Sequence, residues 1–163
     1  GRMIPVKGFD ILVDVAKYLN ETITSFQIRV VGTGSEEYKL KQTIDHCQLT
    51  KYFKFEGFQH NPYPFIANAD IMLSTSIAEG FSLVICEALA LGVPVVSTKT
   101  DGASSMLSNG AGILVERKAK DIAKAIESLL TDNDLAKQYA VRGLKESKKY
   151  DKSEYMPKLY EIL

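Results

Sequence analysis

Apolar residues along the chain fall into short continuous runs that alternate with stripes at helical spacing. The runs, which are typical of buried strands, lie at 28–31, 52–55, 70–73, 93–97 and 113–115. Helical spacing predicts helices over 9–19, 36–49, 61–69, 83–91, 122–130, 134–150 and 153–163, whereas 102–112 is expected to be a loop with at most one helical turn. Elements that alternate in this way predict an α/β fold with a doubly wound parallel sheet flanked by helices.

The loops that follow the strands of such a sheet are the expected place for a ligand. In doubly wound sheets, ligands bind outside the carboxyl ends of the strands, where the strand order reverses. The loops expected at that edge are 2–8, 32–35, 57–61, 75–81 and 98–103. The candidate ligand groups lie in these loops or next to them, so we expect a single binding site at this edge.

Composition excludes several classes of function. The chain has 163 residues, 45% of them hydrophobic, and equal numbers of basic and acidic residues at 20 each. This length suits one domain with a sizeable core, and the zero net charge predicts no general attraction to nucleic acid. No apolar run is long enough to cross a bilayer and no secretory signal is visible, so we expect a cytoplasmic protein whose Cys47 and Cys86 are reduced.

The predicted helix at 83–91 is unusual because Glu87 is its only polar residue. A helix that is apolar on all sides is expected to be buried, and an unpartnered carboxylate in a dry site is unfavourable. Glu87 should therefore face a cleft or have a dedicated partner. Glu79 lies just before the helix start, where free N–H groups and the helix dipole favour an anion. A plainer interpretation stays open, in which Glu79 only complements the dipole and Glu87 is a rim residue.

The same stretch carries a resemblance to a known family. Residues 79–97 read E-G-F-S-L-V-I-C-E-A-L-A-L-G-V-P-V-V-S, with seven residues between the two glutamates. This pattern is similar to the signature of retaining glycosyltransferases of family 4. In that family it lies in the C-terminal, donor-binding half of the two-domain GT-B fold. The resemblance implies that residues 1–163 are a single Rossmann-like domain that binds a nucleotide sugar.

The resemblance also implies roles for individual residues. Gly1-Arg2 and Lys7-Gly8 match the family positions that supply Arg2 and Lys7 to the donor's diphosphate. Glu79 would face the donor hexose, and Glu87 would hold the ribose hydroxyls. The resemblance assigns further nucleotide contacts to the start of the 83–91 helix, at Gly80, Phe81, Ser82 and Leu83. It also assigns the base to a strand end at Phe55 and another contact to the glycine turn at Gly32.

Several weaker signals set limits on this assignment. The turn at 32–34 lacks the third glycine of a dinucleotide fingerprint, so no nicotinamide cofactor is expected. Asp132-Asn133-Asp134 resembles a metal-binding motif but also fits the N-cap of a following helix, and no metal site is predicted. The loop 98–105 departs from the family pattern, because Asp101 replaces a glycine and Ser105 replaces a glutamate.

The implied activity is transfer of a sugar from a nucleoside-diphosphate sugar with retention of configuration. The donor would be a UDP-sugar or a GDP-sugar and no metal would be required. The acceptor would be a sugar or a lipid-linked glycan, as in cell-surface polysaccharide or glycolipid synthesis. The N-terminal acceptor domain, through which any peripheral membrane contact would occur, and the first strand would precede Gly1. The isolated chain is therefore expected to be inactive.

Two other functions remain open. A nucleotide-sugar epimerase can have the same fold, but it needs acid and base groups in the cleft. A non-catalytic nucleotide-binding or interaction module needs only the binding groups.

Overall fold

The strands form two parallel sheets in a computed structural model that describes residues 1–150. One sheet pairs β1 (Ile28–Val31) with β2 (Phe53–Gly57), and the other has the order β3 (Met72–Ser74), β4 (Val95–Thr98), β5 (Ile113–Val115). The predicted α/β fold with parallel strands is confirmed. Within residues 1–150, however, no strand joins the two sheets, so the single continuous sheet that the alternation suggested is divided between β1 and β3.

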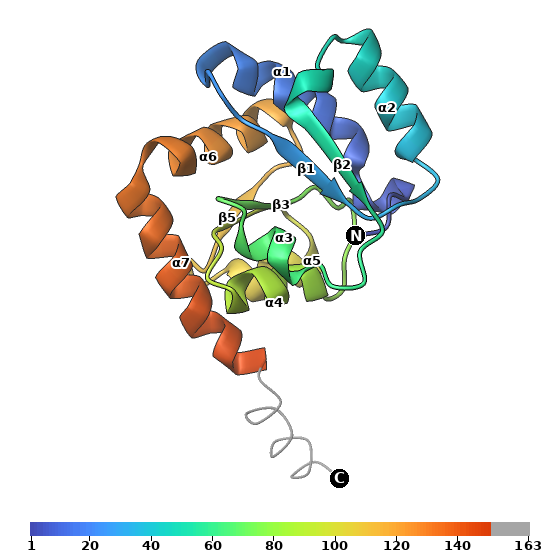
Figure 1. Ribbon diagram of the computed structural model, residues 1–163. Helices are drawn as coiled ribbons and strands as arrows, with labels where there is room; N and C mark the ends of the chain where they lie inside the picture. The colour runs from blue at the N-terminus through green and yellow to red at the C-terminus, as the bar shows by residue number, and fades with distance from the viewer. Residues whose placement is uncertain (151–163) are drawn as a thin grey trace.

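Helices cover these sheets on different sides (Figure 1). α1 and α2 lie near β1 and β2, α4 and α5 gather at the opposite end of the molecule, and α6 continues into α7 along one side. Their bounds are Leu12–Thr22 for α1, Glu37–His46 for α2, Tyr63–Ala67 for α3, Leu83–Ala90 for α4, Asp101–Leu107 for α5, Ala119–Thr131 for α6 and Asn133–Ser147 for α7. The helix predicted over 153–163 lies outside the described residues.

The α5 helix corrects the expectation of a loop over 102–112. Thr100 caps it, because its hydroxyl oxygen accepts a hydrogen bond from the backbone N–H of Ala103 at 3.2 Å. Ala103, Met106 and Leu107 are buried and share one helical face. This stripe was missed because Gly102 and the two serines that follow Ala103 interrupt it with residues typical of turns.

The core lies where the helices meet the sheets. α1 packs on α6 through Val15, Leu19, Ile122 and Ile126, and α4 packs through Ile85, Ala88 and Leu89. The expectation that the α4 segment is buried on all sides is wrong, since Leu83 is 68% exposed at its start. The start of α4 therefore lies at the surface, and only its inner face is part of the core.

Candidate functional site

A cluster of buried hydroxyl groups lies where β3 and β4 end. Thr75 and Ser76 directly follow β3, Thr98 is the last residue of β4, and all three are nearly inaccessible to solvent. Thr98 donates a hydrogen bond from its Oγ1 to the carbonyl oxygen of Ser76 at 2.6 Å. This bond ties the two strand ends together and fixes the backbone from which the loop to α4 begins.

Glu79, in that loop, is held from two directions. The Lys7 Nζ lies 2.7 Å from both Glu79 carboxylate oxygens, and the Ser76 hydroxyl donates to Oε2 at 3.0 Å. The Lys7 side chain is 28% exposed and that of Glu79 only 14%. The fold thus brings together two predicted site residues that are 72 positions apart, and it adds Ser76, which the sequence did not single out.

Gly102 holds the backbone of the same loop. Its N–H donates to the Glu79 carbonyl oxygen at 2.8 Å, and a Cβ at this position would lie 2.8 Å from the Gly80 carbonyl carbon and 2.9 Å from the Glu79 oxygen. A larger residue would force one of the two backbones to move, so α5 can start this close to Glu79 only at a glycine. Gly102 lies in the loop that departs from the family pattern, next to the Asp101 that replaces a glycine of that pattern.

Glu87 has a different environment in the middle of α4. Burial raises the pKa of its carboxyl. Gly1 lies within electrostatic range of both Lys7 and Glu87. No side chain of residues 1–150 forms a hydrogen bond or ion pair with the Glu87 carboxylate.

The glycine turn after β1 packs against the start of the chain. Cβ atoms at Gly32 and Gly34 would collide with the carbonyl groups of Gly1 and Met3, respectively. The Met3 N–H also donates to the Thr33 carbonyl oxygen at 2.9 Å, and the Gly1 amino group donates to that of Val31 at 2.7 Å. Gly32 thus lets the backbone at the start of the chain, rather than a ligand, approach the turn in this structure. This contact places the exposed Arg2 beside the turn.

The remaining predicted residues lie around the start of α4 and on β2. Ser82 occupies the N-cap position of α4 without a side-chain hydrogen bond to the helix, and Phe81 and Leu83 are exposed. Phe55 is half-buried on β2 with the Lys41 ammonium 4.7 Å from its ring centroid. A pocket of about 330 Å³ opens beside Glu79, between the loops that follow β3 and β4, and its lining residues are Ile77, Ala78, Glu79, Gly80, Lys99, Thr100 and Asp101.

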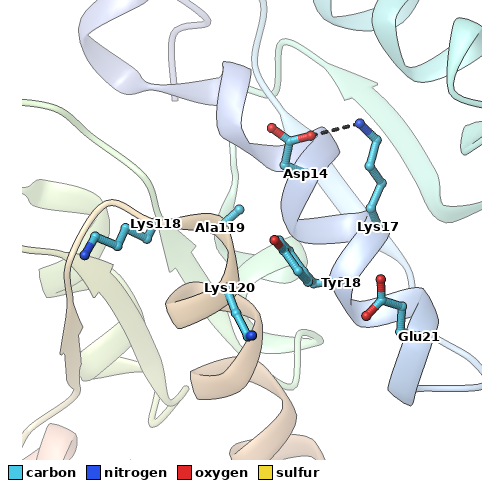
Figure 2. Close-up of a pocket in the computed structure, with 7 residues that line it drawn as sticks. All are labelled: Asp14, Lys17, Tyr18, Glu21, Lys118, Ala119 and Lys120. Carbon is cyan, nitrogen blue, oxygen red and sulfur yellow. Dashed lines mark hydrogen bonds and ion pairs between the residues drawn. The ribbon is translucent and has the colours of Figure 1, made fainter.

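A second pocket, of about 420 Å³, lies between α1 and the start of α6 (Figure 2). The Lys17 ammonium there is bonded to Asp14 at 2.9 Å, while Lys118 and Lys120 point away from each other rather than toward a common centre. None of the predicted site residues lines this pocket. We therefore place the candidate site at the pocket beside Glu79 instead.

Other classes of site find no support in the described part of the chain. Residues 1–150 contain no group of three or more metal-ligating side chains, and no helix among them is long and apolar enough to cross a membrane. Asp132 accepts hydrogen bonds from the N–H groups of Asp134 and Leu135, which confirms the N-cap interpretation of that motif. Cys47 and Cys86 are free thiols, and burial raises the pKa of Cys86 to about 11.

Residues 1–146 match the family model described as glycosyl transferases group 1. The chain belongs to this family. It is 31% identical over 145 residues to the lipopolysaccharide core biosynthesis glycosyltransferase LpsE of Rhizobium meliloti, covering 88% of this chain and 42% of that protein. It is 30% identical over 154 residues to the poly(glycerol-phosphate) alpha-glucosyltransferase of Bacillus subtilis, covering 93% of this chain and 22% of that protein.

Solved structures of related enzymes share the fold of this group 1 glycosyl transferase chain. Anabaena Alr3699/HepE in complex with UDP superposes with a TM-score of 0.91 at 27% identity, over 99% of this chain and 46% of that one. Staphylococcus aureus TarM gives a TM-score of 0.91 at 25% identity, over 99% and 34%. The chain thus spans less than half the length of these relatives. Group 1 membership confirms the predicted family at this broader level.

Proposed function

We propose that this chain is the donor-binding half of a retaining glycosyltransferase of family 4, which transfers a hexose from a nucleoside-diphosphate sugar. The observation that carries the proposal is the Lys7–Glu79 pair, which lies at the start of α4 beside an open pocket. A cation, a helix N-terminus and a carboxylate together suit a ligand that has a diphosphate next to a polyol.

The positive groups would act on the leaving nucleotide. As the bond to the sugar breaks, the nucleoside diphosphate gains negative charge while the sugar becomes cationic. Lys7, Arg2 and the backbone N–H groups at 80–83 would stabilise that charge without a metal ion. The Glu79 carboxylate, which Ser76 holds in place, would then accept hydrogen bonds from the hexose hydroxyls.

Glu87 would bind the ribose. Burial raises the pKa of its carboxyl, and the carboxylate has no side-chain partner among residues 1–150. A vicinal diol would supply two hydrogen-bond donors to such a carboxylate and so replace hydrogen bonds to water that burial removes. Phe55, through its backbone, and Gly32 would lie on the side of the base.

Related proteins favour a uridine nucleotide among the possible donors. HepE, at 27–28% identity, is known in complexes with UDP and with UDP-glucose. The Rhizobium relative is named for lipopolysaccharide core biosynthesis and the Bacillus relative for poly(glycerol-phosphate). By analogy, we propose a UDP-sugar as donor and a cell-surface glycan or lipid-linked glycan as acceptor.

The acceptor would bind to an N-terminal domain that precedes these residues. Within residues 1–150, β1 and β3 are each an edge strand of their sheet, and the Gly1 nitrogen lies 2.7 Å from the Val31 carbonyl oxygen at the end of β1. We propose that a strand leading into Gly1 lies between these edge strands and joins the two sheets. The whole enzyme would be cytoplasmic, would not bind nucleic acid, and would contact the membrane peripherally through its N-terminal domain.

Calorimetric titration with UDP, GDP and ADP, first without metal and then with magnesium, tests the proposal. We expect one nucleotide to bind preferentially and magnesium to leave its affinity unchanged. Residues 1–163 alone should bind that nucleotide and transfer no sugar, whereas the complete enzyme should give a product with the donor's anomeric configuration by NMR. Absence of binding by the folded complete enzyme, or an inverted product, would contradict the proposal.

A further inference from the structure

A second ion pair holds residues 2–10, the segment that carries Lys7 and is called the Lys7 loop below. An Arg117 Nη, from the loop between β5 and α6, lies 2.5 Å from Oδ1 of Asp10. The two residues are 107 positions apart, and the Arg117 side chain is 31% exposed while that of Asp10 is 61% exposed. Arg117 belongs to neither the family motif nor the residues predicted from sequence, so its place beside the Lys7 loop is a result of the tertiary structure.

The Lys7 loop is fixed on one side by the segment that follows β3. Thr75 donates from its Oγ1 to the Lys7 carbonyl oxygen at 3.2 Å, and the Ile77 N–H donates to that of Val6 at 2.8 Å. Gly8 turns the chain immediately afterwards with a positive φ of 64°. A Cβ at Gly8 would collide with the Thr75 carbonyl oxygen, so the two backbones touch at this point.

Arg117 closes the other side of the loop. Its Nε and one Nη would lie 3.2 Å from a Cβ at Gly8, so its guanidinium group lies against the face that the glycine leaves open. Its Nε is buried and has no hydrogen-bond partner. Leaving a buried N–H unpaired is unfavourable, so this position of the Arg117 side chain does not satisfy all of its hydrogen-bond donors. The pairing with Asp10 and the contact with Gly8 therefore determine where the side chain lies.

We propose that Arg117 is a positioning residue: it holds Gly8 and Asp10 against the segment after β3 and so fixes the Lys7 ammonium for the donor's diphosphate. This inference rests on the proposed function. Lys7 has a long flexible side chain, and a small displacement of its backbone changes where its charge lies relative to a bound anion. Arg117 itself does not touch the ligand.

A thermodynamic cycle in nucleotide binding tests the proposal. The full chain and its Arg117→Met, Lys7→Met and double variants are titrated with UDP and with uridine, which lacks the phosphates. Arg117→Met should lower the affinity for UDP roughly fivefold to tenfold and leave the affinity for uridine unchanged. In the Lys7→Met background, the same substitution should have no further effect on the affinity for UDP. Arg117→Lys should be intermediate, because an ammonium keeps the charge but cannot lie flat against Gly8.

Several results would overturn the proposal. These are an unchanged affinity for UDP, an equal loss for UDP and uridine, or an equal loss of UDP affinity with and without Lys7. Arg29→Met is the matched control, because Arg29 is 35% exposed and pairs with Glu56 at 2.7 Å on the β1–β2 sheet. Its effect on UDP affinity should be the same in the Lys7→Met background as in the wild type.

Urea unfolding separates this proposal from the proposed function. If the complete enzyme binds none of the nucleotides, the proposed function fails, but the positioning contact can still be tested. The loss in urea midpoint for the Arg117→Met, Glu79→Gln double variant should be smaller than the sum of the two single losses, since Arg117 would support the Lys7–Glu79 pair. Additive losses would overturn the positioning role.

Discussion

Glu79 and Glu87 are the two acidic residues of one signature, yet the structure places them in contrasting environments. Glu79 lies in a loop, where Lys7 and Ser76 bind its carboxylate. Glu87 lies on a helix, has no side-chain partner among residues 1–150, and has a raised pKa. One carboxylate is therefore held by the protein's own side chains, whereas the other has no side-chain partner among residues 1–150.

Removing the organised carboxylate should have the largest effect. In the complete enzyme, Glu79→Ala should lower the rate of sugar transfer by about 10²-fold, the order of loss expected when the donor sugar is no longer held in its reactive position. Initial rates at saturating donor measure this effect. The change should also destabilise the fold by about 1–3 kcal/mol, because Lys7 and Ser76 lose their shared acceptor.

Asp14→Ala is the control for the stability part of that prediction. Asp14 pairs with Lys17 at 2.9 Å, but both side chains are more than half exposed. Loss of such a surface pair should change the free energy of unfolding by less than about 1 kcal/mol. Equal losses for the two alanine variants in urea unfolding would show that the Glu79 cluster is no more stabilising than an ordinary surface pair.

Removing the unpartnered carboxylate should affect binding rather than folding. Glu87→Ala should lower the binding affinity for the preferred nucleoside diphosphate roughly 10- to 100-fold, since hydrogen bonds to a charged group contribute about 1.5–3 kcal/mol each. The same titration with a 2′,3′-dideoxynucleotide should show no difference between variant and wild type. Unchanged affinity for the normal nucleotide would remove Glu87 from the proposed site.

The smallest expected effect is a pH dependence of stability. Because the pKa of Glu87 is higher in the folded chain than in the unfolded chain, the folded state binds more protons between the two values. Wild-type stability should therefore fall relative to Glu87→Gln as pH rises through this interval and then stay constant. Urea unfolding of both proteins at pH 4 and pH 7 measures the change, and a pH-independent difference would contradict it.

The order of elements was largely predictable because local periodicity determines it. The apolar runs corresponded to all five strands of residues 1–150, with bounds that differ by no more than two residues at each end. α5 was missed, because its apolar positions are separated by glycine and serine, and the exposure of Leu83 was missed, because composition alone cannot show which face of a helix meets the core. The helix predicted at 153–163 lies outside the described residues.

The candidate site was only partly predictable. The signature identified Glu79 and Glu87, and the matching of short motifs identified Arg2 and Lys7. Neither approach could show that Lys7 pairs with Glu79, that Ser76 donates to the same carboxylate, or that Gly102 must be a glycine. These contacts depend on how distant loops meet at the ends of the strands.

By itself, the sequence determined the order of the strands and of every described helix except α5, the broad family, and the short segment that supplies two carboxylates, because each of these is encoded by neighbouring residues. The tertiary structure alone decided which carboxylate is paired and which is not. It also placed Arg117 against Gly8 and Asp10, more than 100 positions earlier in the chain. The physical reason is that charge pairing and burial depend on spatial distance, which only the folded chain defines.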